Sequence, residues 1–343
     1  MATNELHETA KALVAEGKGI LAADESTGTI KKRFDSIGLE STEDTRRAYR
    51  DMLFTTPGVE EFISGVILYD ETIRQSAHDG TPFPQLLESK GVIPGIKVDE
   101  GAKPLAHADG ETVTEGLDGL RERLAEYRKL GARFAKWRGV YSISDTKPSE
   151  YAIWTNAHAL ARYAALCQEA GIVPIVEPEV LQDGTHTIER SEFVTSRVLA
   201  ALYTELFDQR VDVAGTLLKP NMVLSGYEAS KRAGVDQVAE QSLHAYYKHV
   251  PAAVPGVVFL SGGQSDEDAT AHLNAMNARG PHPWQLSFSY GRALQAPALD
   301  AWHGKPENVE AGQRAYYHRA KMNSAARSGL YAPEMEREAA AVA

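Results

Sequence analysis

The stretch GTLLKPNMV, residues 215–223, ends a predicted buried strand with a lysine and a proline. Its apolar residues are continuous rather than alternating, which is typical of a strand covered on both faces in a parallel sheet. Comparable apolar runs recur along the chain at intervals of roughly 40 residues, the spacing expected when a helix follows each strand. The eight runs are GILAAD (19–24), ISGVILYD (63–70), GIKVD (95–99), FAKWRGV (134–140), IVPIVEPE (172–179), GTLLKPN (215–221), GVVFLSGG (256–263) and WQLSFSY (284–290).

Amphipathic helices are predicted between these strands. The segment 116–131 places Leu120 and Leu124 on one face and closes with Gly131 as its C-cap. A second helix is predicted from Ser149, its N-cap, to residue 171. Strands that alternate with helices in this way predict one α/β domain, a (β/α)8 TIM barrel. An open doubly wound sheet is the alternative, which the lack of a glycine-rich dinucleotide fingerprint after the first strand disfavours.

The two ends of the chain are expected to lie outside the barrel repeat. The first 19 residues form an amphipathic segment, so we expect an extra N-terminal helix. Residues 307–329 predict a C-terminal helix, and the residues after it are rich in alanine and glutamate. We therefore expect a barrel domain over residues 1–330 and a mobile C-terminal tail over residues 331–343.

The composition excludes several classes of protein. With 43% hydrophobic and 24% charged residues, the 343-residue chain has the balance of an ordinary globular protein. Its net charge of −11 argues against a nucleic-acid-binding surface, so any site for anions must be local. A single cysteine, Cys167, excludes a disulfide framework, and no segment has the pattern of a signal peptide or a membrane span. We expect a soluble, cytoplasmic protein with no nucleic-acid or membrane partner.

Charged and hydroxyl side chains stand at the carboxyl ends of most predicted strands. Any one of them alone is more often a solvated loop boundary, but burying so many unpaired charges separately would be costly. Loops at this end of the strands build the active sites of TIM barrels, so we expect these side chains to share one polar cluster. Residues two apart along a strand, such as Lys136 and Arg138, point to the same side. The residues are Asp24, Lys97, Asp99, Lys136, Arg138, Glu177, Glu179, Lys219, Ser261 and Ser289.

A lysine inside such a cluster suits imine chemistry. An amine attacks a carbonyl only when it is deprotonated, and both desolvation and a neighbouring cation lower the pKa of a lysine. Lys219 follows an apolar run and is expected to face Lys136 across the barrel mouth, so both influences are available to it. Glu177 and Glu179 could then move protons as the imine forms. The sequence thus makes Lys219 a candidate Schiff-base nucleophile.

Two further motifs indicate phosphate binding. FLSGGQS (259–265) and SFSYGRAL (287–294) combine glycines, hydroxyls and Arg292 after the last two strands, where TIM barrels often bind phosphate. A second group, Ser26, Arg33, Lys97 and Arg138, could hold another phosphate farther out. The substrate is therefore predicted to be a bisphosphate.

Taken together, the motifs of the chain resemble the class I, Schiff-base fructose-bisphosphate aldolases. The resemblance runs over about residues 10–331 and rests on KGILAADESTGTI, GIKVD, FAKWR, VPIVEPE, GTLLKPNMV, FLSGGQS and SFSYGRALQ. It implies a lyase that reversibly cleaves fructose 1,6-bisphosphate into dihydroxyacetone phosphate and glyceraldehyde 3-phosphate in glycolysis or gluconeogenesis. It also implies a homotetramer that uses no metal and no other cofactor.

The resemblance assigns a role to each site residue. Lys219 forms the imine, Glu177 is the acid and base of imine formation, and Asp24 lies close to the C4 hydroxyl. Lys136 tunes these groups electrostatically, and Glu179 orients the lysine and assists proton transfer. The residues for the C1 phosphate are Ser261, Gly262, Gly263, Ser289, Gly291 and Arg292, and those for the C6 phosphate are Ser26, Thr29, Arg33, Lys97 and Arg138.

The sequence departs from the animal members of the family at two places. Thr29 stands where those enzymes have a serine, and its hydroxyl is retained. The sequence ends EREAAAVA, without the terminal tyrosine that closes over the site in the animal enzymes, and Tyr331 is too early to replace it. The step that protonates the enamine, and the preference for the bisphosphate over fructose 1-phosphate, are therefore left open.

Three other functions remain as alternatives. A metal-dependent barrel enzyme would use Asp24, Glu177 and Glu179 as ligands, but nearby lysines would repel a divalent ion and no HExxH motif is present. A different imine-forming sugar-phosphate lyase would need the same amine. An inactive oligomeric scaffold would need none of these groups.

Overall fold

The computed structural model of the protein describes residues 2–338. Eight strands of this part of the chain close into a parallel barrel. The strands follow one another around the barrel in the order β1, β2, β3, β6, β7, β8, β9 and β10. The predicted TIM barrel is confirmed, and the open-sheet alternative is wrong. The strands are β1 (Gly19–Ala23), β2 (Ile63–Leu68), β3 (Ile93–Lys97), β6 (Phe134–Tyr141), β7 (Val173–Val180), β8 (Leu217–Leu218), β9 (Gly256–Phe259) and β10 (Gln285–Tyr290).

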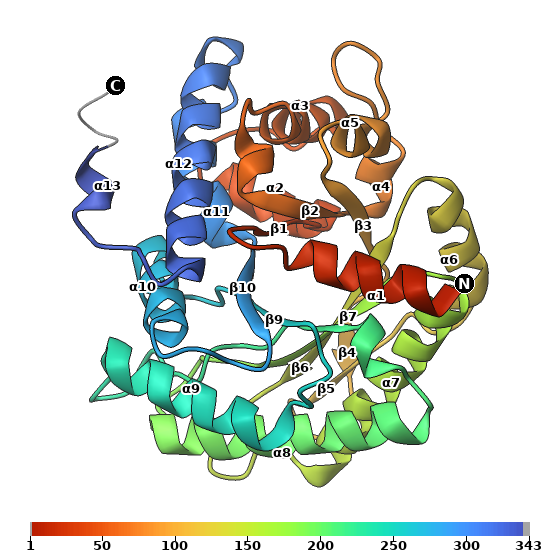
Figure 1. Ribbon diagram of the computed structural model, residues 1–343, viewed down its shortest axis with the longest axis vertical. Helices are drawn as coiled ribbons and strands as arrows, with labels where there is room; N and C mark the ends of the chain where they lie inside the picture. Colours follow the sequence, from red (N-terminus) through yellow and green to blue (C-terminus); the bar gives the residue numbers. More distant parts are fainter. Residues whose placement is uncertain (1, 339–343) are drawn as a thin grey trace.

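Helices surround the barrel (Figure 1). The predicted N-cap Ser149 accepts a hydrogen bond from the amide of Ala152 and starts a 20-residue helix. A short hairpin of β4 (Ala102–Pro104) and β5 (Thr112–Thr114) was not predicted. The helices are α1 (Ala2–Leu13), α2 (Thr27–Asp35), α3 (Glu43–Phe54), α4 (Asp70–Ile73), α5 (Phe83–Ser89), α6 (Leu120–Lys129), α7 (Glu150–Glu169), α8 (Ile188–Asp208), α9 (Val235–His249), α10 (Asp266–Asn277), α11 (Arg292–Trp302), α12 (Val309–Arg327) and α13 (Met335–Glu338).

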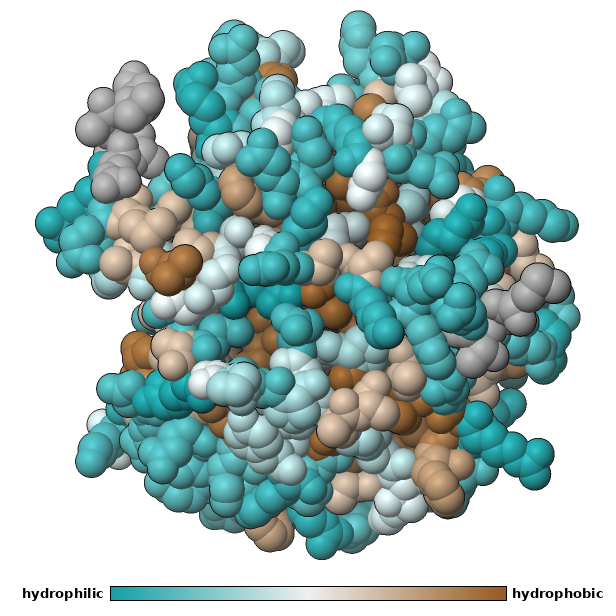
Figure 2. Space-filling model, in the orientation of Figure 1, coloured by the Kyte–Doolittle hydropathy of each residue, from teal (hydrophilic) through white to brown (hydrophobic). Residues whose placement is uncertain are grey.

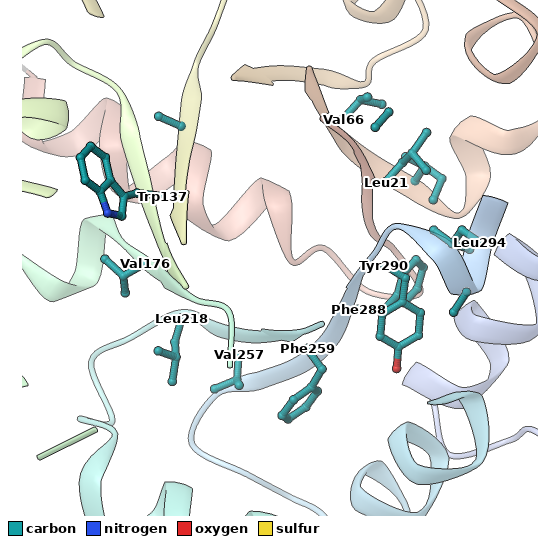
Figure 3. Packing of buried hydrophobic residues seen from close by; sticks show 14 of the residues in the cluster. Leu21, Val66, Trp137, Val176, Leu218, Val257, Phe259, Phe288, Tyr290 and Leu294 are labelled. Carbon is teal, nitrogen blue, oxygen red and sulfur yellow. The ribbon is translucent and has the colours of Figure 1, made fainter. Parts of the chain in front are cut away.

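The alternation of side chains along each strand divides the core into two layers. Outward-facing residues such as Leu21, Val176 and Leu218 pack under the helices, as Figure 3 shows. Their neighbours Ile175 and Leu217 belong to a separate cluster that fills the barrel interior. Because strand side chains have a period of two, the residues two and four positions after an interior residue also point inward. Along strands such as β7 the inward-pointing side chains therefore change from apolar at the bottom of the barrel to polar at the top.

Helix α1 closes the apolar end of the barrel, and Figure 1 shows it lying across that end. Its residues Leu6 and Leu13 belong to the same cluster as the interior strand residues. Glycines make room for this packing, since a Cβ built on Gly65 would lie 2.7 Å from Leu13 and one on Gly95 would lie 2.3 Å from the ring of Phe134. The face that α1 crosses is largely hydrophilic, with scattered hydrophobic residues (Figure 2).

The C-terminal segment differs from the mobile tail expected from residue 331. Tyr331 is buried, and its amide donates a hydrogen bond to Asn274 of α10. Glu336 pairs with Arg319 of α12 at 2.6 Å. Residues 331–338 are therefore docked on two helices because specific polar contacts anchor them, whereas residues 339–343 lie outside the described part of the chain. Within that described part, no helix is long and apolar enough to cross a membrane.

Candidate active site

A cavity of about 570 Å³ lies at the carboxyl ends of the barrel strands. Of the residues predicted for the site, all but Gly263 line it. Gly263 lies on the loop after β9 and is exposed, and a Cβ built on it would lie 2.6 Å from the ring of Tyr227. The predicted residues that line the cavity are Asp24, Ser26, Thr29, Arg33, Lys97, Lys136, Arg138, Glu177, Glu179, Lys219, Ser261, Gly262, Ser289, Gly291 and Arg292.

Strand parity explains why charged side chains point into the barrel. Leu217 fills the interior, so Lys219 two residues later points to the same side. Ile175 likewise precedes Glu177, and Phe134 precedes Lys136. The lysine that ends the apolar run therefore stands on top of the apolar interior layer and faces the cavity.

The carboxylate of Glu177 lies between two ammonium groups. Nζ of Lys219 is 3.4 Å from its Oε1, and Nζ of Lys136 is 3.4 Å from its Oε2. All three residues are at least 95% buried, with relative exposures of 4%, 3% and 4% for Lys219, Glu177 and Lys136. Oε2 of Glu177 has no hydrogen-bond partner within the described chain. Glu177 is therefore placed to exchange protons with a ligand bound to Lys219.

Lys136 is the centre of a group of carboxylates. Its Nζ lies 2.7 Å from Asp24 and 3.9 Å from Asp99. Burial opposes the charge of Asp24, but Lys136 and Lys219 hold the pKa of its carboxyl well below the ordinary value. Burial likewise opposes the charge of Lys136, but Asp24 and Glu177 raise the pKa of its ammonium. Both groups are therefore charged at neutral pH.

Glu179 has a different partner from the one expected. It forms an ion pair with Arg138 on the neighbouring strand rather than with the lysine that it was predicted to orient. The register places Arg138 opposite Glu177 and Val140 opposite Glu179. The long Arg138 side chain therefore reaches two residues farther along β7 to Glu179. Burial opposes the charge of Arg138, and Glu179 raises the pKa of its guanidinium.

One end of the cavity combines hydroxyls, glycines and a helix N-terminus. Ser289 is buried, and its Oγ has no hydrogen-bond partner within residues 2–338. Gly291 directly precedes α11, whose N-terminal amides can bind an anion. Arg292 donates a hydrogen bond to the carbonyl of Gly262 at 2.7 Å, which joins the two loops. Gly262 itself has a φ of 58°, a conformation that glycine adopts without strain.

A second polar group lies around the N-terminus of α2. Ser26 is the N-cap of this helix, and its hydroxyl is 3.1 Å from that of Thr29. Arg33 comes from the same helix, and Lys97 joins from the end of β3, where it pairs with Asp99 at 2.9 Å. This second group adjoins the first, since a Cβ built on Gly291 would lie 3.7 Å from Nη2 of Arg33.

Sequence reasoning missed a buried carboxylate at this second group. Glu25 lines the cavity and pairs with both Arg33 and Arg50. The sequence could have indicated Glu25, since it directly follows Asp24 at the carboxyl end of a predicted strand. No sequence signal pointed to Arg50, because it lies on the buried face of α3 like many core residues of that helix.

Comparison with known proteins identifies the family of the chain. The sequence model of a glycolytic family, fructose-bisphosphate aldolase class-I, matches residues 5–343. The chain belongs to the class I fructose-bisphosphate aldolase family. A "probable fructose-bisphosphate aldolase class 1" of Xylella fastidiosa is 56% identical over 332 residues, which cover 96% of this chain and 99% of the relative. "Fructose-bisphosphate aldolase 4, cytosolic" of Arabidopsis thaliana is 55% identical over 96% of this chain and 84% of its own length.

A solved aldolase has nearly the same fold. It is the fructose-bisphosphate aldolase of Plasmodium falciparum, crystallised in complex with TRAP and a small-molecule inhibitor. The TM-score is 0.95 at 51% sequence identity, and the match covers 96% of both chains. The resemblance inferred from the sequence motifs is confirmed. The protein is a class I aldolase, a carbon–carbon lyase that reversibly cleaves fructose 1,6-bisphosphate through a Schiff base.

Proposed function

We propose that Lys219 is the amine that forms the imine with C2 of fructose 1,6-bisphosphate. The observation that best supports this is the position of its ammonium group, which is buried at the cavity and lies 3.4 Å from Oε1 of Glu177. A carboxylate this close can accept a proton and leave an amine free to attack a carbonyl. Attack of Nζ on C2 gives a carbinolamine, and loss of its hydroxyl as water gives the protonated imine.

Glu177 is assigned to the proton transfers of these two steps. It accepts a proton from Nζ and returns one to the leaving hydroxyl of the carbinolamine, so that water departs. Its position between Lys219 and Lys136 supports this role, since the fixed positive charge of Lys136 stabilises the carboxylate whenever it has given up its proton.

Asp24 is assigned to the cleavage step. It accepts the proton of the C4 hydroxyl as the bond between C3 and C4 breaks and glyceraldehyde 3-phosphate leaves. The electron pair of that bond moves to the protonated imine and gives a neutral enamine. Because its pKa is depressed, Asp24 is a weak base, and the imine must therefore supply most of the driving force. Protonation of the enamine at C3 and hydrolysis of the imine then release dihydroxyacetone phosphate.

The two anion-binding groups are assigned to the two phosphates. Ser261, Gly262, Ser289, Gly291 and Arg292 bind the C1 phosphate. The residues for the C6 phosphate are Ser26, Thr29, Arg33, Lys97 and Arg138. Both groups line one cavity, which supports a substrate that carries two phosphates.

The mechanism is proposed to need no metal and no other cofactor. Among residues 2–338, no three histidine, cysteine, aspartate or glutamate side chains are grouped so as to hold a metal ion. The carboxylates available are already paired with cations: Asp24 with Lys136, and Glu179 with Arg138. A divalent ion would have to displace these groups against their charge.

The protein is proposed to be a cytoplasmic homotetramer whose other partners are sugar phosphates. Tyr151 and Trp154 on α7 and Phe193 on α8 are large apolar side chains that are 51%, 42% and 53% exposed. An ion pair between Glu150 and Arg197 joins the two helices beside them. Exposed aromatic side chains on neighbouring helices favour a contact with another subunit. The word "cytosolic" in the name of the Arabidopsis relative supports the location.

Trapping with borohydride tests the assignment of Lys219. We expect reduction in the presence of dihydroxyacetone phosphate to inactivate the enzyme and to label Lys219 covalently, as located by peptide mass mapping. The variant Lys219→Arg should take no label and lose cleavage activity by at least about 1000-fold. Labelling of another lysine would overturn the assignment. Activity that vanishes with a chelator would support a metal mechanism, and a preference for another sugar phosphate would indicate a different lyase.

A further inference from the structure

A buried carboxylate that the mechanism above does not use holds two guanidinium groups. Glu25 follows β1, and its two oxygens bind different arginines: Oε1 accepts from Arg33 of α2, and Oε2 accepts from Arg50 of α3 at 2.6 Å. Burial opposes the charge of Glu25, but Arg50 and Arg33 hold the pKa of its carboxyl below the ordinary value. The carboxylate is therefore charged and shared.

The two arginines differ in what they can reach. The side chain of Arg50 is only 4% exposed, and Arg50 does not line the cavity. The side chain of Arg33 is 25% exposed and lines the cavity. Two cations share one anion, so the group carries a surplus positive charge, and Arg33 is the member that can present it to a ligand.

A glutamine connects this group to α11, the helix that begins after Gly291. Nε2 of Gln295 donates to Glu25 at 2.8 Å and to the carbonyl of Ala22 at 2.7 Å. Its Oε1 accepts from Arg50 at 3.4 Å. Gln295 lies in the first turn of α11, three residues after Arg292 of the other phosphate group. The network therefore links the helix at one phosphate site to the arginine at the other.

We propose that Arg50 is a positioning residue that selects for a substrate with a second, outer phosphate. This inference rests on the proposed function. By taking one oxygen of Glu25, Arg50 prevents that carboxylate from acting as a full counter-ion that competes with the phosphate for Arg33. Through Gln295 it also holds Arg33 at a fixed place relative to α11. Arg50 itself touches no substrate.

The substitution Arg50→Met removes the guanidinium that shares Glu25 with Arg33 and keeps the apolar length of the side chain. A hydrogen-bonded charge lost in this way predicts a KM for fructose 1,6-bisphosphate that is about 10- to 100-fold higher. The KM for fructose 1-phosphate, which lacks the outer phosphate, should change by less than about 2-fold. Arg50→Lys keeps the charge but not the fork of donors, so its effect should be smaller and again confined to the bisphosphate.

Arg46→Met is the matched control, since Arg46 lies one turn earlier on α3 and pairs with Glu71 at 2.6 Å, away from Glu25. It should leave the ratio of the two KM values unchanged. Equal increases for both substrates in the Arg50→Met variant, or no increase, would overturn the proposal. If that variant does not fold, the same comparison in Arg50→Lys decides. Borohydride trapping of dihydroxyacetone phosphate does not involve the outer phosphate, so its loss in the wild-type enzyme would mean that the proposed function, and not this inference alone, has failed.

Discussion

Nζ of Lys136 lies 2.7 Å from Oδ2 of Asp24, and the two residues form a buried ion pair between strands on different sides of the cavity. Lys136 also lies near Asp99 and Glu177, so one ammonium faces three carboxylates. Lys97 and Lys219 supply the remaining positive charge, by pairing with Asp99 and Glu177. The charge balance of the site therefore depends on Lys136 more than on any other single cation of this cluster.

Replacing Lys136 by methionine should destabilise the fold as well as the chemistry. The variant leaves Asp24 buried without its ion-pair partner, whereas Asp99 keeps Lys97, and we expect the free energy of unfolding to fall by about 3–5 kcal/mol. Urea unfolding measures this. Lys31→Met is a matched control, since Lys31 pairs with Asp35 where both side chains are more than half exposed, at 60% and 54%. Its effect should stay below about 1 kcal/mol. Similar losses in the two variants would refute the view that burial makes the Lys136 pairs important.

The hydroxyl of Ser289 has a different predicted effect. It is buried without a hydrogen-bond partner in the described chain, so Ser289→Ala removes no internal bond and should keep the unfolding free energy within about 1 kcal/mol. If the hydroxyl binds the C1 phosphate, the KM for the substrate should rise about 10-fold or more, because hydrogen bonds to charged groups are strong. Steady-state kinetics with fructose 1,6-bisphosphate checks this. An unchanged KM, together with unchanged stability, would remove Ser289 from the binding site.

Much of this site could be predicted because the barrel gives each strand a regular alternation. Lys219 and Glu177 point inward because each lies two residues after an interior residue of its strand. The partners of Glu179 could not be predicted, since register and side-chain length decide between Arg138 and a lysine. Arg50 was also missed, because only the tertiary position of α3 brings it to Glu25, which is distant in the sequence.

Element boundaries were harder to predict where the backbone leaves the sheet. The strand predicted over residues 215–221 is reduced to Leu217–Leu218, because Pro220 has no amide to extend the ladder. The predicted helix over residues 116–131 begins only at Leu120, after Gly119 in a left-handed conformation. The hairpin of β4 and β5 has no apolar run that would reveal it, since all three residues of β4 are exposed.

Close packing at the bottom of the barrel predicts a specific cost for a single methyl group. A Cβ at Gly95 would lie 2.3 Å from the buried ring of Phe134, so Gly95→Ala should lower the unfolding free energy by about 1–3 kcal/mol. Gly28→Ala is the control, since a Cβ at Gly28 meets nothing within 4 Å and Gly28 lies in helix α2. That change should stabilise the protein by about 0.5–1 kcal/mol. Urea unfolding compares the two, and equal effects would contradict the packing described for the interior.

The contact that docks the C-terminal segment predicts a pH dependence. Partial burial opposes the charge of Glu336, but hydrogen bonds from His318 and Arg319 lower the pKa of its carboxyl from 4.5 to about 2. A carboxyl whose pKa is lower in the folded state stabilises that state fully above the unfolded value. This stabilisation is then lost as the pH falls from 4.5 toward 2.

Glu336→Gln should therefore be less stable than the wild type near neutral pH, and the difference should shrink as the pH falls below about 4. Denaturant midpoints measured between about pH 7 and about pH 3 give this curve, with Glu310→Gln as the control, because Glu310 is 87% exposed and 3.8 Å from Arg314. Limited proteolysis at neutral pH should cut the segment after residue 330 faster in the Glu336→Gln variant, since the bonds to His318 and Arg319 hold it on α12. A difference in stability that stays constant with pH would show that the charge of Glu336 contributes nothing to this docking.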